Sequence, residues 1–242
     1  MVAIFPVIDP SEVQMSPAKV IQRFENLKHR DGVVSAVRDR VFQKARESWI
    51  GSVFALLYST LTRQKYWIQE VEEKQEPPDL MIYSYRNPTD LGEIGVVREQ
   101  ILLEVCEYPK NVKCGLVDHL LNKLANKRYH PETWLVCYIR RPGEAMKLID
   151  VIEGLRELKI CVKEIWLLFT VEGEVGGQHR TARVYSRGMS QKETPIVVDG
   201  NYLELMSVPQ AEFLKAKRGL DKTVLITKGN LTIVPLPKRH AK

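Results

Sequence analysis

The stretches "PPDLMIYSYR" (residues 77–86) and "VVREQILLEVCEY" (residues 96–108) are two apolar runs separated by a short polar connection. Branched and aromatic residues are frequent in both runs, as in strands, and the connection "NPTDLGEIG" (residues 87–95) is rich in turn formers. Strands joined by so few residues are expected to pair antiparallel. The sequence therefore predicts a hairpin with Asp79 at the mouth of its first strand and Glu104 inside its second.

Two helical patterns precede this hairpin. The segment "SPAKVIQRFENLKHR" (residues 16–30) opens with Ser16 as N-cap and Pro17 at the first helical position, which are start signals of an amphipathic helix. Helical spacing continues through residues 33–62, whose second half is apolar on more than one face and should be buried. The charged stretch at residues 69–78 is expected to end this region, because its two prolines cannot continue a helix.

Helices and strands alternate after the hairpin. Residues 114–129 and 143–158 have helical periodicity, and residues 133–141 and 160–173 are nearly continuous apolar runs. Such runs are typical of central strands that are covered on both faces. The order over residues 33–172 is thus helix, two strands, helix, strand, helix, strand, which predicts an α/β fold with a mixed central β-sheet flanked by helices.

The chain becomes more polar and Gly-bearing from about residue 173. We expect strands at 195–200 and 202–208, a short helix at 209–220 and a hairpin over 222–236. These patterns divide the chain into a helical N-terminus plus α/β core (residues 1–172) and a C-terminal β-rich extension (residues 173–242). We expect the extension to pack on the same core, with a separate domain as the alternative.

Composition permits a polyanionic partner without demanding one, because 36 Lys and Arg face 30 Asp and Glu, a formal charge of +6. No stretch approaches the ~20 apolar residues that span a bilayer, and the first residues lack the pattern of a signal peptide. We therefore expect a cytoplasmic protein without a membrane partner. The four cysteines form no CxxC pair, so a zinc knuckle is not expected, and reduced core cysteines are the simpler interpretation.

The two acids of the hairpin are the clearest chemical signal. A divalent cation that activates water needs two or more carboxylate oxygens converging from rigid elements. Asp79 and Glu104 could supply them. In the second strand, the alternation of side chains places Glu104 and Cys106 on one face and Val105 and Glu107 on the other.

The order of elements, together with Pro78-Asp79 followed by Glu104, resembles the PD-(D/E)XK nuclease superfamily, which has the restriction-endonuclease-like fold. The resemblance covers roughly residues 33–172 and depends mainly on element order, because the motif itself is short. It implies Mg²⁺- or Mn²⁺-dependent hydrolysis of phosphodiester bonds, by an endonuclease or an exonuclease. The implied partner is nucleic acid, DNA in the first instance and RNA as the alternative.

The resemblance implies a role for each residue that matches the motif. Asp79 and Glu104 would be metal ligands, Val105 would add its backbone carbonyl, and Glu47 would match an additional acid on the preceding helix. Cys106 occupies the lysine position, where a thiol cannot supply a fixed positive charge. Relatives recruit that cation from elsewhere, and here Lys110, Lys113 and Lys123 are the candidates, with Lys113 and Lys123 assigned to catalysis.

Several basic residues are candidates for contacts to the nucleic acid. Arg140 and Arg141 follow the third strand, and His119 lies on the helix after the hairpin. The segment at residues 173–188 is interpreted as a flexible loop whose arginines could fork onto phosphates, although an exposed hairpin loop is the commoner explanation. Its arginines are Arg180, Arg183 and Arg187.

Two alternatives stay open. Cys106 favours a catalytically degenerate nuclease fold that serves as a nucleic-acid-binding or protein-interaction subunit, either as a homodimer or within a larger complex. A plain α/β interaction protein is the other alternative, for which Glu104 should be paired with a nearby cation, such as Arg98 or Arg140, and no acidic cluster should exist.

Overall fold

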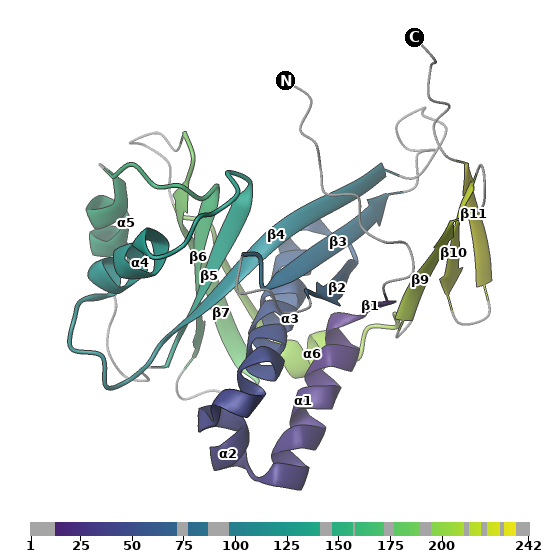
Figure 1. Cartoon of the computed structure of the whole chain (residues 1–242), viewed down its shortest axis with the longest axis horizontal. Helices are drawn as coiled ribbons and strands as arrows, with labels where there is room; N and C mark the ends of the chain where they lie inside the picture. Colours follow the sequence, from purple (N-terminus) through teal and green to yellow (C-terminus); the bar gives the residue numbers. More distant parts are fainter. Residues whose placement is uncertain are drawn as a thin grey trace.

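The computed structural model arranges the strands of the chain in one mixed sheet with helices packed on its faces (Figure 1). The structure describes residues 13–71, 77–86, 97–140, 147–156, 158–171, 177–188, 195–210, 213–218, 222–227 and 230–235. The expected turn at 87–95 and Arg141 lie outside these residues, as does the side chain of Arg98.

The N-terminal helix begins where its start signals predict. Helix α1 spans Pro17–Asp31, and the Oγ of Ser16 accepts a hydrogen bond from the backbone N–H of Lys19 at 3.2 Å. The side chains of Val20, Ile21 and Phe24 are buried on one face of α1. This face packs against α3, as expected of an amphipathic helix.

The helical region after Gly32 is broken, which corrects the expectation of one continuous pattern. It consists of α2 (Val33–Arg38), a 3₁₀ turn η1 (Arg40–Phe42) and α3 (Gln43–Thr62). Asp39 is extended between α2 and η1, and its carbonyl accepts hydrogen bonds from the N–H of Phe42 at 3.1 Å and from Nη1 of Arg46 at 2.7 Å. The middle of α3 is buried on all sides from Ser48 to Leu57, as its apolar sequence predicts.

Strand β2 was missed by the sequence analysis. Helix α3 ends at Thr62, where Arg63 adopts a left-handed conformation with φ of 57°, and strand β2 follows at Tyr66–Glu70. Four of the five residues of β2 are buried, so the strand lacks the alternation by which a half-buried strand is recognised.

The predicted hairpin is present and lies in the middle of the sheet. Strands β3 (Leu80–Arg86) and β4 (Val97–Tyr108) pair antiparallel, with Leu80 opposite Leu103. Strands β5 (Thr133–Ile139) and β6 (Glu164–Thr170) continue the sheet parallel to β4. The connections carry helices α4 (Leu116–Ala125) and α5 (Leu148–Arg156), where helices were expected.

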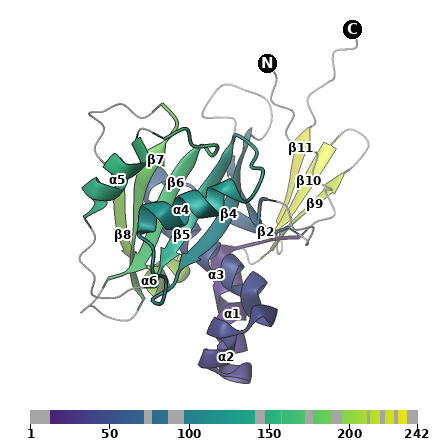
Figure 2. The same ribbon diagram turned by 60° about the vertical axis from the view of Figure 1, so that its left-hand side comes forward.

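The two faces of the sheet have separate cores. Helices α1 and α3 pack with Val105, Trp134 and Trp166 on one face. Helices α4 and α5 pack with Cys106 and Cys137 on the other. Figure 2 shows α4 and α5 in front of β5 and β6, whereas α1 and α2 extend beyond the sheet. Strand β4 therefore presents alternate side chains to two different helical layers, as its period-two pattern predicts.

The C-terminal residues occupy both edges of the sheet, whose strand order is β11-β10-β9-β1-β2-β3-β4-β5-β6-β7-β8. Next to β6 lie β7 (Gln178–Ser186) and β8 (Val197–Asn201), while β1 (Val13–Met15) joins the sheet to β9 (Phe213–Arg218), β10 (Lys222–Thr227) and β11 (Asn230–Pro235). The hairpin of β10 and β11 was expected, and its turn residues 228 and 229 lie outside the described residues.

Three assignments in this part of the chain were wrong. The expected strand at 202–208 is helix α6 (Tyr202–Met206), which begins where Oδ1 of Asn201 accepts a hydrogen bond from the N–H of Leu203. The expected helix at 209–220 contains strand β9, held by pairing with β1 and β10. The expected loop at 173–188 contains strand β7, held between β6 and β8.

Among the described helices, none combines the length and the apolar composition needed to cross a membrane.

Candidate functional site

Strand β4 has an open edge beside the predicted acids. Strand β3 begins at Leu80, opposite Leu103, so β4 has no β3 partner from Glu104 to Tyr108 and pairs there with β5 alone. The N–H and C=O of one strand residue point to the same side. Because the N–H of Val105 points to this edge, its carbonyl does so as well.

Asp79 covers part of the open edge. Its Oδ2 accepts a hydrogen bond from the backbone N–H of Val105 at 2.8 Å, and its backbone carbonyl accepts one from Nζ of Lys44 at 2.8 Å. Burial raises the pKa of Asp79 to about 7, and the negative charges of Glu104 and Glu47 add to the effect. Such a carboxyl is about half protonated near neutral pH, and a cation that binds it would have to displace that proton.

Glu104 is fully buried and points to the opposite face of β4, toward α4. Its Oε1 accepts from Nζ of Lys123 at 2.9 Å and from Nζ of Lys127 at 2.7 Å. Its Oε2 is buried without a hydrogen-bond partner among the described residues. A buried carboxylate oxygen in that condition is costly, which makes it a natural place for a ligand.

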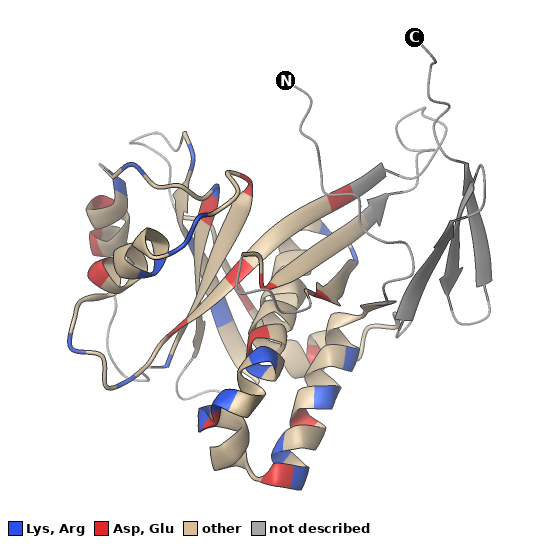
Figure 3. Cartoon of the chain, in the orientation of Figure 1, with Lys and Arg blue, Asp and Glu red and all other residues tan. Residues whose placement is uncertain are grey.

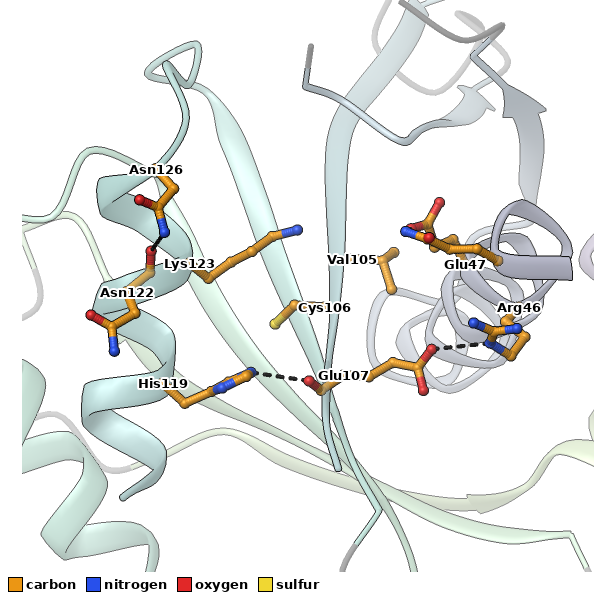
Figure 4. A pocket seen from close by; sticks show the side chains of 10 residues that line it. Arg46, Glu47, Val105, Cys106, Glu107, His119, Asn122, Lys123 and Asn126 are labelled. Atoms are coloured by element: carbon orange, nitrogen blue, oxygen red, sulfur yellow. Dashed lines mark hydrogen bonds and ion pairs between the residues drawn. The ribbon is translucent and has the colours of Figure 1, made fainter. Parts of the chain in front are cut away.

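Glu47 brings a third carboxylate from α3. Its Oε1 accepts from Nε2 of Gln43 at 2.9 Å, and Nζ of Lys44 lies 4.0 Å from its Oε2. Figure 4 shows Glu47 and Lys123 reaching toward β4 from its two sides. They line a pocket of about 380 Å³ that is open to solvent. The pocket is lined by Gln43, Arg46, Glu47, Val105, Cys106, Glu107, His119, Asn122, Lys123 and Asn126.

Lys123 brings a positive charge from α4 to Glu104. Burial lowers the pKa of Lys123, but the charge of Glu104 and the hydrogen bond to it outweigh burial and leave that pKa raised, so Lys123 stays charged. Lys127, which the sequence analysis did not select, approaches the same Glu104 oxygen. Lys113 is exposed between β4 and α4 and is not among the described residues that line the pocket.

Cys106 lies against a second cysteine. It is the register partner of Cys137 on β5, both thiols are free and buried, and the hydrogen bond between them raises the pKa of Cys137, with burial adding to it. This confirms reduced core cysteines at these two positions, whereas Cys161 is exposed. The raised pKa of Cys137 is the opposite of what an activated nucleophile needs.

Two residues assigned to nucleic-acid contacts lie near the pocket. His119 lines it, and Nε2 of its ring is 3.0 Å from the backbone oxygen of Glu107. Arg140 follows β5, and its Nη2 lies 2.5 Å from Oε2 of Glu107. Arg140, named as one possible partner of Glu104, instead pairs with Glu107 on the other face of β4. Glu104 is paired, as the interaction-protein alternative expects, but with Lys123 and Lys127.

The arginines of the 173–188 segment are not in a flexible loop. Arg180 and Arg183 lie on strand β7, and Arg187 follows directly after it. Each guanidinium group lies near an acid: Arg180 is 2.5 Å from Asp199, Arg183 is 3.6 Å from Glu164, and Arg187 is 3.9 Å from Glu132. Strands β5 and β6 separate β7 from β4, so the structure does not bring these arginines together with Asp79 and Glu104.

The donors at the open edge can be compared with what Mg²⁺ or Mn²⁺ requires. Among the described residues, no three His, Cys, Asp or Glu side chains stand ready to hold a metal ion. Mg²⁺, however, is commonly held by one or two carboxylates with water and substrate oxygens completing its shell. Two carboxylates, one with an unpartnered oxygen, and the Val105 carbonyl fit that type of site.

Comparisons with known proteins provide no relative from which a function could be transferred. No family model, no curated protein and no solved structure matches the chain. Any function must therefore be argued from the residues at the open edge of β4.

Proposed function

We propose that the chain is a metal-dependent nuclease with a restriction-endonuclease-like core, acting on phosphodiester bonds of DNA or RNA at the open edge of β4. The observation that carries the proposal is the placement of Asp79, Glu104 and Glu47 around the open edge, where burial raises the pKa of Asp79 to about 7 and the charges of the other two acids add to the effect. Lys123 and Lys127 both pair with Oε1 of Glu104, so its Oε2 and the carboxyl of Asp79 are oxygens that a divalent ion could use.

Five residues at the open edge of β4 and beside it have a role in this proposal. Asp79, Glu104 and the carbonyl of Val105 hold Mg²⁺ or Mn²⁺, and when bound the ion supplies an acidified water and neutralises phosphate charge. Glu47 keeps the site negative enough to retain the ion. Lys123 approaches from α4 and places a positive charge beside the phosphate, where a fixed cation stabilises developing negative charge.

The ammonium groups of Lys123 and Lys127 both use Oε1 of Glu104, so Oε2 stays available to the ion. Lys123 therefore takes the task of the motif lysine from a neighbouring helix. Cys106, which lines the pocket, has no part in the chemistry.

A cleavage assay tests the proposal. Plasmid DNA, single-stranded DNA and RNA are incubated with the full chain and Mg²⁺ or Mn²⁺, and hydrolysis should be lost in Asp79→Asn and in Glu104→Gln. Glu132→Gln, which removes a carboxylate outside the pocket, is the matched control and should cleave normally. Absence of cleavage with both metals on all three substrates contradicts the proposal.

The second candidate is a nuclease-like fold that binds nucleic acid or a partner protein without cleaving it. It is favoured by the double pairing of Glu104 with Lys123 and Lys127, because these two cations already balance the buried charge. Nucleic-acid binding that survives both EDTA and Asp79→Asn, in a chain that cleaves no substrate, would support this candidate over the first.

A further inference from the structure

The α2–η1 surface, which we define as Val33, Val34, Arg38, Arg40 and Val41, combines exposed apolar and exposed basic side chains. The three valines are 61%, 67% and 86% exposed. Such exposure of neighbouring apolar side chains on one projection is a sign of a binding surface. Figures 1 and 2 show α1 and α2 extending beyond the sheet, so neighbouring elements leave this surface accessible.

The charge of this surface is not balanced by its acids. Asp31 pairs with Arg30 at 2.7 Å, whereas Asp39 accepts a hydrogen bond from the neutral hydroxyl of Ser35 and keeps its charge, so Arg38 and Arg40 exceed the neighbouring acid by one charge. Arg38 and Arg40 are exposed, and within the described part of the chain no hydrogen bond or ion pair holds their guanidinium groups. Figure 3 shows further Lys and Arg residues along the projecting helices. The surface thus presents two available cations.

A half-buried carboxylate, that of Glu107, ties this surface to the strand that carries Glu104. Oε1 of Glu107 accepts from Nε of Arg46 at 3.2 Å, and its Oε2 lies 2.5 Å from Nη2 of Arg140. Arg46 in turn donates to the carbonyls of Ala36 and Asp39, at 3.3 and 2.7 Å, and Arg140 donates to that of Val37 at 3.2 Å. Three carbonyls around the end of α2 are therefore tied to β4.

The same arrangement places the surface next to the pocket. The turn η1 leads directly into Gln43, which lines the pocket together with Arg46 and Glu47. A chain bound with one phosphate in the pocket would have to leave it past α3 or α4. On the α3 side, the first groups beyond the pocket are those of η1 and α2.

We propose that the α2–η1 surface binds single-stranded nucleic acid as it leaves the pocket, with Arg38 and Arg40 on phosphates and the valines against unstacked bases. The inference rests on the proposed function, since it names the substrate class of that same site. Arginine forks match phosphate oxygens. Apolar side chains find contact area on base faces that are free only in single strands, because duplex stacking buries those faces.

Binding measured in EDTA tests the inference without requiring cleavage. Fluorescence anisotropy of a labelled 20-nucleotide single-stranded DNA, the RNA of the same sequence and the matching DNA duplex is recorded with the full chain. The double change Arg38→Ala with Arg40→Ala should weaken single-strand binding about tenfold and reduce the slope of log K against log salt by about 1–2. Arg156→Ala with Lys159→Ala, which removes two charges at the exposed end of α5, is the matched control and should change binding less than twofold.

Val41→Ser tests the contact with bases separately from the contact with phosphates, because it removes apolar surface without changing charge. It should weaken single-strand binding about threefold to tenfold and leave the salt slope and duplex binding unchanged. Equal losses on the single strand and the duplex overturn the assignment to single strands. Unchanged binding in both the arginine and the valine variants would overturn the proposal that this surface binds nucleic acid. The proposal would also be overturned if light scattering showed that the variants lose self-association while they keep nucleic-acid binding.

The two proposals fail in distinguishable ways. Single-strand binding that depends on Arg38 and Arg40, in a chain that cleaves nothing, keeps the surface and removes the nuclease. Cleavage that depends on Asp79, with binding indifferent to the α2–η1 variants, keeps the nuclease and removes the surface.

Discussion

Oδ2 of Asp79 accepts a hydrogen bond from the backbone N–H of Val105 at 2.8 Å, so the acid at the start of β3 is tied to the residue that follows Glu104. This bond replaces the strand pairing that β4 loses where β3 begins. It brings Asp79 close enough to Glu104 for the two charges to interact. The end of one strand thereby produces both the open edge and the convergence of acids on it.

Asp79→Asn is expected to make the protein more stable at neutral pH. The pKa of Asp79 is raised from 3.8 to about 7 by burial and by its acidic neighbours, so folding favours the protonated form. A raised folded-state pKa gives stability that is present below pH 4 and is lost as pH rises through 7. Asparagine stays neutral, and its side-chain oxygen can still accept the hydrogen bond from the N–H of Val105. The free energy of unfolding of Asp79→Asn should therefore exceed that of the wild type by about 2–4 kcal/mol at pH 8.

Urea unfolding in EDTA at several values of pH between 4 and 8 measures this difference. Glu132→Gln provides a control of opposite sign, because a hydrogen bond from Lys163 lowers the pKa of Glu132 and gives stability that is lost as pH falls. That contribution should be small, since the Glu132 side chain is 40% exposed. A gap between wild type and Asp79→Asn that does not change with pH would contradict the raised pKa.

Binding of Mn²⁺ should release a proton from Asp79. Below pH 7 the carboxyl is largely protonated and the ion has to displace that proton, whereas at pH 8 it is already ionised. Calorimetry in buffers of different ionisation enthalpy should therefore find close to one proton released at pH 6 and close to none at pH 8. The affinity should rise up to about tenfold per pH unit below 7, and a pH-independent affinity would argue against Asp79 as a ligand.

Lys123 and Lys127 should differ in their effect on cleavage although both pair with Glu104. Lys123 lines the pocket and Lys127 does not. Lys123→Met should lower the rate about 10²–10⁴-fold, the range for loss of a positioned catalytic group. Lys127→Met removes an equal charge from the same oxygen and should lower the rate less than about tenfold. Single-turnover rates, with circular dichroism to verify folding, compare the two, and equal losses would assign both lysines to holding Glu104.

The parts of the fold that sequence patterns predicted are those in which local and tertiary preferences agree. The alternation in β4 and the spacing in α1 each match a face that is buried in the structure. Strand β2 is buried on both faces and had no alternation to reveal it. Strand β9 did carry a signal, because Leu214 and Ala216 alternate with Lys215 and Lys217, but the pattern was interpreted as a short helix.

The sequence predicted the acids of the candidate site but only some of its cations. The motif spacing selected Asp79 and Glu104, and the structure brings their charges together. Lys127 follows Lys123 by four residues, which would place both on one side of the helix expected at 114–129, and this was the available signal for the second ammonium. In the structure α4 ends at Ala125, and Lys127 lies just beyond it. Lys44 could not be found in this way, because its bond to the Asp79 carbonyl joins residues from α3 and the start of β3.

Gly51 determines how closely α3 approaches the acid-bearing hairpin. A Cβ built on Gly51 would overlap Cδ1 of Leu80 and lie 3.2 Å from Cδ2 of Leu103. Leu80 and Leu103 are fully buried cross-strand partners. Leu80 directly follows Asp79, and Leu103 directly precedes Glu104. Gly51→Ala should therefore lower the free energy of unfolding by about 1–3 kcal/mol, although alanine favours helix by about 1 kcal/mol.

The displacement should also reach the pocket, because Asp79 and Glu104 each adjoin one of the displaced leucines. Gly51→Ala is thus expected to weaken Mn²⁺ binding without touching the ion, by separating the two carboxylates. Gly154→Ala is the matched control in α5, where the added methyl meets only the side chain of Val117 on α4. Urea unfolding and Mn²⁺ titration of both variants test this, and a Gly51→Ala protein with wild-type stability would mean that α3 can move away from the hairpin at no cost.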